Sequence, residues 1–185
     1  MSAVIAGLHA LFWTIFAVRG VVGLLATRAA DSQTTPTSIG VVVLHALGMG
    51  AFFGALLPTL QLRIWLWPPQ PELGAVVLVA ANALAIWTLL VFRSWRLAAQ
   101  LDSDHELMTT GPFALVRHPI YVSVNLYGLG TLLALPSAWL LAGTVALWVT
   151  GDTRARAEEL ALIGVFGDDY RQYSQRVKRF FPGVY

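Results

Sequence analysis

The stretch Gly111-Pro112-Phe113-Ala114-Leu115-Val116-Arg117-His118-Pro119-Ile120-Tyr121, here called the central motif, separates a polar part of the chain from an apolar one. Acidic side chains precede it, and no charged residue occurs between Ile120 and Val149. Proline is favoured at the first position of a helix, where its missing N–H would have no partner, and it pushes the preceding residue towards an extended conformation. The sequence therefore predicts a helix that begins at Pro119 and runs into an apolar environment.

A helix that begins there leaves N–H groups unpaired from about Ile120 to Ser123. Such donors, with Arg117 beside them, favour a carboxylate or a phosphate. The alternative is that Arg117 and His118 only anchor a membrane helix at the lipid head groups. On the residues alone, both interpretations stay open.

The composition is that of a membrane protein. The 185 residues are enough for one domain, and only 12% of them are charged while 57% are hydrophobic, against about 25% charged residues in soluble domains. The chain has no cysteine, which excludes disulfides, thiolate catalysis and a cysteine-based metal site. The net charge of +2 and the scattered basic residues argue against nucleic acid as a partner. We expect a single domain, residues 1–185, without a metal.

Apolar stretches define the predicted fold. Three of them are long enough for a ~30 Å hydrocarbon core, which needs about 20 residues: 3–27, 39–60 and 73–92. Two shorter runs, 120–135 and 138–150, should form a helical hairpin that need not cross the whole bilayer. The prediction is an all-α, multi-pass integral membrane protein with about five transmembrane segments, the last two being this hairpin.

The C-terminal segment 152–178 is charged, and we expect it to form surface helices with breaks at Gly164 and Gly167 and a second short helix from about Asp168. Lys and Arg accumulate on the cytoplasmic side of membrane proteins. In the five-segment arrangement, Arg63 alone among the basic residues of the connecting segments falls on the other side. The N-terminus should then be outside, and the central motif and the C-terminal helices cytoplasmic.

The apolar stretches also contain residues that are unusual in a membrane. We expect Arg19 to extend towards the interface and His45 to be a hydrogen-bonded packing residue. Gly48, Gly50 and Gly54 should allow close contact between helices.

A second polar feature is formed by Arg154, Glu158 and Glu159. Arg154 and Glu158 are four residues apart and share one helix face. A surface ion pair would contribute little to stability. If the two side chains instead meet Arg117 and His118, the group could bind a zwitterion or a dication at the membrane surface.

Together the two features resemble the isoprenylcysteine carboxyl methyltransferases. The central motif with the preceding His105-Glu106-Leu107-Met108 is similar to their cofactor motif, and Arg154, Glu158-Glu159, Phe166-Gly167-Asp168-Asp169-Tyr170 and Tyr173 are similar to their C-terminal signature. The resemblance covers about the last 85 residues. The related phospholipid methyltransferases share the same plan.

This resemblance implies a membrane enzyme that uses S-adenosylmethionine, with three spans in 1–97 and the cofactor-binding catalytic part in 98–185. It implies contacts with the cofactor from the following residues: His105, Glu106, Leu107, Met108, Phe113, Arg117, His118, Pro119, Ile120, Tyr121, Glu158 and Glu159. Arg154 would face the methyl acceptor and, with His118, act in catalysis. Phe113 stands where many members have tyrosine, and the glutamine that the family has upstream is missing.

The acceptor is left open between a prenylcysteine carboxylate and a membrane lipid amine, thiol or hydroxyl. A carboxylate needs no general base, whereas for the others His118 or Glu159 would be candidates. Two other functions compete with methyl transfer. A sterol-reductase-type enzyme that uses NADPH has a similar Arg-His-Pro-x-Tyr motif, although Ile120 and Val122-Ser123 replace its usual Asn and acidic residue. The third possibility is a non-enzymatic membrane protein.

Overall fold

The computed structural model describes residues 3–27, 39–92 and 107–184. The elements found there are helices: α1 (Ala3–Thr27), α2 (Ile39–Leu62), α3 (Pro71–Val91), the 3-10 turn η1 (Gly111–Ala114), α4 (Pro119–Ala134), α5 (Ala138–Phe166) and α6 (Asp168–Arg176). Helices α1, α2 and α3 are each long and apolar enough to cross a membrane, and α4 is a shorter apolar helix. The all-α membrane fold is thereby confirmed.

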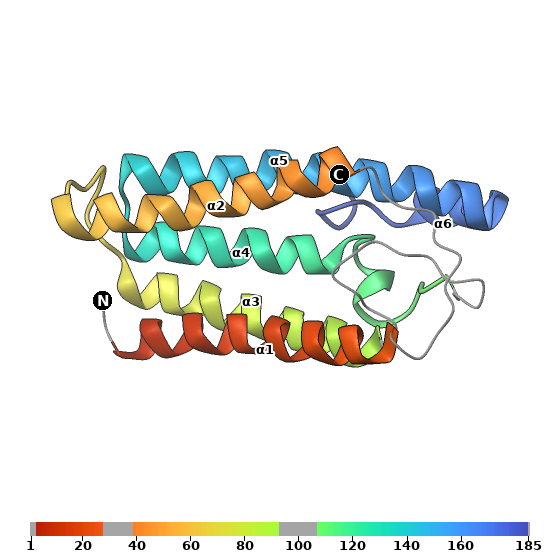
Figure 1. Cartoon of the computed structure of the whole chain (residues 1–185), viewed down its shortest axis with the longest axis horizontal. Coiled ribbons are helices and arrows are strands. Elements are labelled where there is room, and N and C mark those ends of the chain that lie inside the picture. The colour runs from red at the N-terminus through yellow and green to blue at the C-terminus, as the bar shows by residue number, and fades with distance from the viewer. Residues whose placement is uncertain (1–2, 28–38, 93–106, 185) are drawn as a thin grey trace.

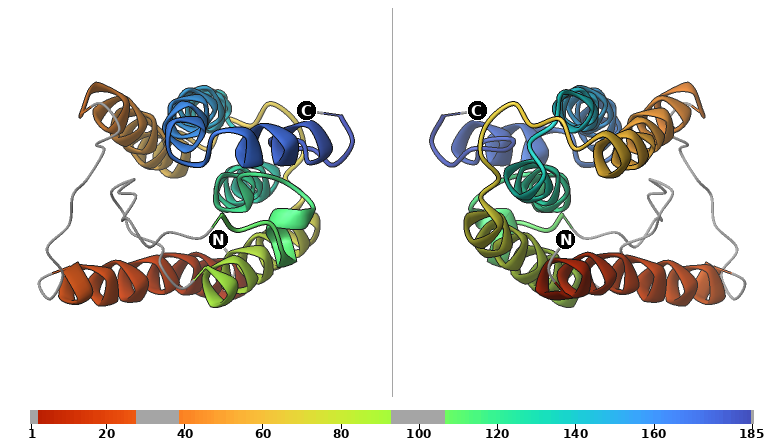
Figure 2. Two further views of the ribbon diagram at one scale, coloured as in Figure 1. Left: turned by 90° about the vertical axis from the view of Figure 1, so that its right-hand side faces the viewer. Right: turned by 90° about the vertical axis from the view of Figure 1, so that its left-hand side faces the viewer.

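The helices form a bundle with α4 in the middle (Figure 1). Helix α4 packs on α3 and on α5, α2 packs on α5, and α1 packs on α3. Helix α1 is inclined to the others, as the end-on views in Figure 2 show. The central motif and α6 lie at one end of the bundle, here called the motif end, and the α2–α3 and α4–α5 connections lie at the opposite end (Figure 1).

An aromatic cluster holds α1, α2 and α4 together. The ring of Tyr127 stacks on Phe12 with centroids 4.6 Å apart, and it contacts Phe52 at 5.8 Å. Trp13 donates a 2.9 Å hydrogen bond to the Tyr127 hydroxyl. Phe12, Phe52 and Tyr127 are almost completely buried, so these rings fix α1 against the rest of the bundle through both packing and a buried polar contact.

Only one of the three glycines expected to permit close packing does so. A Cβ at Gly48 would lie 2.2 Å from Oγ1 of Thr150, whereas Gly50 and Gly54 have nothing within 4 Å. Helix α2 therefore approaches α5 closely at Gly48, and the other two glycines lie on its open side.

The region after residue 138 differs from the prediction. The last apolar run and the charged segment form a single 29-residue helix, α5, which continues through Gly151 and Gly164. A glycine inside a helix costs only about 1 kcal/mol, which packing against α2 and α4 outweighs. Gly167, with a φ of 55°, does end the helix, and α6 begins at Asp168 as predicted. The charged half of α5 is therefore rigidly continuous with the half that packs in the bundle.

Candidate active site

The central motif folds as its proline and glycine predict. Gly111 has a φ of 60°, a left-handed conformation that favours glycine, and it lies against Val91 at the end of α3. His118 has φ −125° and ψ 64°, and Pro119 occupies the first turn of α4. The motif thus turns beside α3 and starts α4 at the predicted residue.

The C-terminal tail is attached to this motif. Val116 and Lys178 form a parallel β-bridge. The N–H groups of Arg117 and His118 donate to the carbonyls of Lys178 and Arg179, at 2.8 and 3.2 Å. These bonds bring the side chain of Arg179 next to those of Arg117 and His118.

Glu159, on α5, is the centre of an ion cluster. Its Oε1 accepts hydrogen bonds from Arg117 Nε and Nη2 at 3.0 and 2.9 Å, and from Arg179 Nε at 2.9 Å. Its Oε2 accepts from Arg179 Nη2 at 2.6 Å. His118 Nε2 lies 3.2 Å from Oε1. Both carboxylate oxygens of Glu159 are therefore occupied by protein groups.

The cluster is electrostatically satisfied even though it is largely buried. The side chain of Glu159 is 12% exposed, as is that of Arg179, and that of Arg117 is 11% exposed. Burial alone would raise the pKa of Glu159, but hydrogen bonds from Arg179, His118 and Arg117 outweigh it and hold this pKa well below its usual range. Glu159 is thus a firmly ionised anchor between α5, the central motif and the tail.

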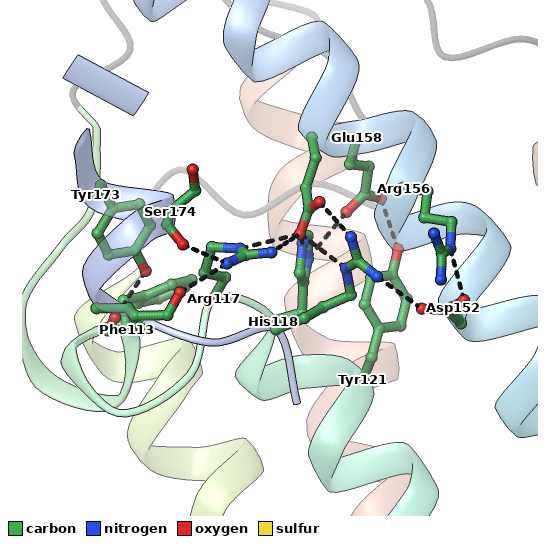
Figure 3. A network of polar contacts seen from close by, with 12 residues as sticks. Phe113, Arg117, His118, Tyr121, Asp152, Arg156, Glu158, Tyr173 and Ser174 are labelled. Carbon is green, nitrogen blue, oxygen red and sulfur yellow. Dashed lines mark hydrogen bonds and ion pairs between the residues drawn. The ribbon is translucent and has the colours of Figure 1, made fainter. Parts of the chain in front are cut away.

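Arg117 extends the cluster to α6. Its Nη1 donates to the carbonyls of Ser174 and Val177 at 2.9 and 2.6 Å. Tyr173, also on α6, donates a 2.6 Å hydrogen bond to the carbonyl of Phe113. Helix α6 is therefore fixed to the central motif on the side of Arg117 that faces Phe113 (Figure 3).

Glu158, the next residue of α5, has different surroundings. Its Oε1 accepts a 2.5 Å hydrogen bond from the Tyr121 hydroxyl and a 3.1 Å bond from Nε of Arg154. Its Oε2 lies 3.8 Å from Nδ1 of His118, and its side chain is 20% exposed. Compared with Glu159, this carboxylate has fewer cationic partners and more contact with solvent.

The structure brings together six of the predicted site residues, one group from the central motif and α4 and the other from α5: Arg117, His118, Tyr121, Arg154, Glu158 and Glu159. Glu158 meets Tyr121 and lies near His118 of the central motif, and Arg154 joins them through its bond to Glu158. Phe113 lies farther along the motif, where its ring contacts Phe92 at 5.4 Å. Leu107 and Met108 precede η1 and are half-buried, Pro119 and Ile120 form the first turn of α4, and His105 and Glu106 lie outside the described residues.

Three members of the network had not been singled out from the sequence. Arg179 pairs with Glu159 and, through Nη1 at 3.2 Å, with Oδ1 of Asp152. Asp152 in turn accepts from Arg156 at 2.7 Å. Arg179 follows Lys178 and precedes two phenylalanines, and a charge beside two aromatic residues is the only local signal it offers. Its partner lies 20 residues away and is fixed by tertiary structure.

Comparison with known proteins points to one family. Residues 73–164, about half of the chain, match the model of the Isoprenylcysteine carboxyl methyltransferase family. A Protein-S-isoprenylcysteine O-methyltransferase of Schizosaccharomyces pombe is 37% identical over 86 residues, which are 46% of this chain and 36% of that protein. The human protein of the same name is 33% identical over 84 residues, 45% of this chain and 30% of the relative.

The matched part of this chain thus spans about a third of the length of these relatives, 36% and 30% in the two cases. It includes α3, the central motif, α4 and nearly all of α5, and therefore both polar features of the site. Through residues 73–164, this chain is related to the isoprenylcysteine carboxyl methyltransferase family.

Proposed function

We propose that this protein is an S-adenosylmethionine-dependent methyltransferase that acts on a lipophilic acceptor in the membrane. The observation that carries the proposal is the position of Glu158, whose carboxylate contacts Tyr121 and Arg154 and lies beside His118. Groups from both polar features thus converge at one end of an apolar bundle, within the part of the chain that matches the family model.

The residues around Glu158 fit the proposed cofactor. S-adenosylmethionine carries positive charge on its ammonium and sulfonium groups, and a partly exposed carboxylate that is not saturated by cations suits such a charge. We assign cofactor contacts to Glu158, His118 and Tyr121, with Pro119 and Ile120 in the same turn of α4 and Phe113, Leu107 and Met108 at the edge. When bound, the cofactor supplies an activated methyl group.

Glu159 and Arg117 hold the residues of this site in position and do not contact the cofactor themselves. Because both oxygens of Glu159 already accept hydrogen bonds from Arg117, Arg179 and His118, we assign these groups to positioning. They hold the ring of His118, whose two nitrogens face the two carboxylates. His118 would then orient Glu158 and the cofactor, and it would not remove a proton from the acceptor.

Methyl transfer from a sulfonium group is an in-line displacement, so alignment of the two partners is most of the catalytic task. Positioning of reactants can supply about 7–11 kcal/mol. The charge of the sulfonium is dispersed during the reaction, which a dry site favours. The rigid continuity of α5 serves this purpose, because it fixes Arg154 and Glu158 relative to the bundle.

The acceptor side is assigned to Arg154. The names of the relatives designate enzymes that act on protein-bound isoprenylcysteine, which suggests an acceptor with an apolar tail. Arg154 lies one helical turn before Glu158, nearer the apolar half of α5, where the head group of such a molecule would arrive from the lipid. Membrane lipids would be its other contacts.

The orientation in the membrane follows from the basic residues. Arg117, Arg154, Arg171, Arg176 and Arg179 lie at the motif end, while Arg63 follows α2 at the opposite end. Arg28, Arg93 and Arg96, on which the prediction also drew, lie outside the described residues. We propose that the motif end is cytoplasmic. A C-terminal reporter that is active only outside the cytoplasm would contradict this orientation.

The decisive experiment is calorimetry on the purified protein with S-adenosylhomocysteine and, separately, with NADPH. Binding of S-adenosylhomocysteine alone is expected. Binding of NADPH alone would support the reductase alternative, and binding of neither would leave a non-enzymatic membrane protein.

A further inference from the structure

His45 has surroundings that packing alone does not account for. It is the seventh residue of α2 and half-buried, and its ring lies edge-on to that of Tyr121 with centroids 5.6 Å apart. A Cβ on Gly151 of α5 would be 4.0 Å from Cε1 of His45 and 3.9 Å from Cδ1 of Tyr121. The imidazole therefore lies at the junction of α2, α4 and α5, next to a residue that bonds to Glu158.

The position of His45 relative to the site follows from the helix geometry. Gly151, Arg154 and Glu158 are spaced by three and four residues and share one face of α5. At 1.5 Å per residue, Gly151 lies about 10 Å deeper in the bundle than Glu158, with Arg154 between them. His45 is thus the innermost polar side chain of a series that leads from the proposed cofactor contact, past Arg154, towards the lipid.

The ring of His45 has one nitrogen without a partner. Nδ1 is buried and makes no hydrogen bond within the described part of the chain. A neutral imidazole carries one N–H and one lone pair. In the tautomer that is protonated on Nε2, Nδ1 therefore presents a lone pair at the junction of α2, α4 and α5.

His9 shows what a packing histidine looks like in this protein. Its Nδ1 lies 2.7 Å from the carbonyl of Ile5, and its Nε2 lies 3.0 Å from Oγ1 of Thr131. Both nitrogens are satisfied within the bundle, as is usual for buried polar groups. The expectation that His45 would be of this kind is not met at Nδ1.

Resting on the methyl transfer proposed above, we propose that His45 takes a proton from the acceptor, and that the acceptor is a lipophilic molecule with an acidic hydroxyl or a thiol. Nδ1 accepts the proton of the O–H or S–H group, and the resulting anion lies near the guanidinium of Arg154, which stabilises it. The anion takes the methyl group of S-adenosylmethionine as the C–S bond breaks, S-adenosylhomocysteine is released, and His45 returns its proton to solvent.

The neighbours of His45 select among the acceptors. A carboxylate that is already ionised has no proton to give up and would gain nothing from Nδ1. An ammonium group would be repelled by Arg154. A phenol, an enol or a thiol on an apolar tail is neutral on entry and anionic at the moment of transfer, which suits a neutral base followed by a cation.

The test compares wild type with His45→Gln, and with His9→Gln as the control for loss of an intramembrane histidine. The probes are a prenyl-substituted phenol, a prenyl thiol, a prenylcysteine thioether acid, and a nitro-substituted prenyl phenol that is ionised at the assay pH. General-base catalysis contributes about 10²–10⁴-fold. His45→Gln should therefore lose at least about 100-fold in methyl transfer to the plain phenol and the thiol, while its transfer to the ionised phenol stays within about threefold of wild type.

One measurement besides turnover accompanies this comparison. The affinity of His45→Gln for S-adenosylhomocysteine should equal that of wild type. His9→Gln should behave as wild type in the ratio between the two phenols.

Equal losses on both phenols, or transfer by wild type to the thioether acid alone, would overturn the role of His45 and leave the methyltransferase proposal standing. A wild-type protein that binds no S-adenosylhomocysteine and methylates none of the probes would overturn both.

Discussion

Two adjacent carboxylates on α5 face two different parts of the molecule. Glu159 faces the central motif and the C-terminal tail, where Arg117, Arg179 and His118 occupy both of its oxygens. Glu158 faces Tyr121 and Arg154 and is the more exposed of the two, with 20% against 12% of its side chain accessible. The first face joins α5 to the central motif and the C-terminal tail, whereas the second leaves a carboxylate with capacity to bind a cation.

The difference predicts that Glu159 contributes to stability and that Glu158 contributes to ligand binding, although the two are adjacent on one helix. A buried carboxylate among paired cations is costly to remove, because the cations are then left without compensation. A partly exposed carboxylate with neutral and cationic neighbours can exchange one partner for a ligand. The predictions below test whether the two faces are as distinct as their contacts indicate.

The largest effect is expected for Glu159→Gln. The substitution leaves the guanidinium groups of Arg117 and Arg179 buried without a full counter-charge, and it should lower the free energy of unfolding by about 3–5 kcal/mol. Thermal unfolding in detergent measures it. Asp168→Asn is the control, since it removes an exposed ion pair with Arg171 and should cost about 1 kcal/mol or less. Similar losses in the two variants would contradict the anchoring role.

Acid should weaken the same face. Because the pKa of Glu159 is lowered in the folded protein, its ionisation stabilises the fold above the pKa of an unfolded glutamate, about 4.3, and this contribution is lost as the pH falls below that value. The free energy of unfolding of wild type should therefore decrease more steeply below about pH 5 than that of Glu159→Gln. Parallel slopes would show that Glu159 is not the group concerned.

On the other face, Glu158→Gln should act on ligand binding. We expect the affinity for S-adenosylhomocysteine to fall by about 1.5–3 kcal/mol, the contribution of a hydrogen bond that involves a charged group. The melting temperature should change less than in Glu159→Gln. Calorimetry on the folded variant measures the affinity, and an unchanged value would return Glu158 to the role of a surface ion-pair partner of Arg154.

The smallest effect is expected for Arg154→Lys, which tests whether Arg154 belongs to the binding site of the methyl donor or to that of the acceptor. Arg154→Lys keeps the charge but loses the planar fork that matches an anion. It should leave the affinity for S-adenosylhomocysteine unchanged and reduce turnover about tenfold, or about 1.4 kcal/mol. Parallel loss of affinity and turnover would place Arg154 in the donor site.

Local sequence signals were sufficient to predict the three long apolar helices and the beginning of α4 at the candidate site. The first stretch coincides with α1, the second and third agree with α2 and α3 within two residues, and α4 begins at Pro119. Hydrophobic length and the steric effect of proline act within a few residues, so they can be recognised without knowledge of the fold. The two motifs that resemble the family also lie in continuous stretches.

The continuity of α5 could not be recognised in the same way. The change from apolar to charged residues at Asp152, together with Gly151 and Gly164, indicated separate segments. Packing against α2 and α4 keeps the first half helical, and the second half continues it at little cost because each added residue gains a hydrogen bond once a helix exists. The distribution of apolar and charged residues indicates whether a helix lies in lipid, in protein or in water. Along α5 this environment changes, but the helix continues.

The sequence by itself determined an all-α membrane protein, the boundaries of its first helices, the turn at Gly111 and the helix start at Pro119, because these depend on length, composition and backbone sterics. Only the tertiary structure decided which carboxylate is saturated and which is available, that Arg179 returns to the site, and that His45 lies beside Tyr121. The partners of these charged side chains come from segments 20 to 60 residues away in the chain. No local sequence pattern indicates which distant segment will supply them.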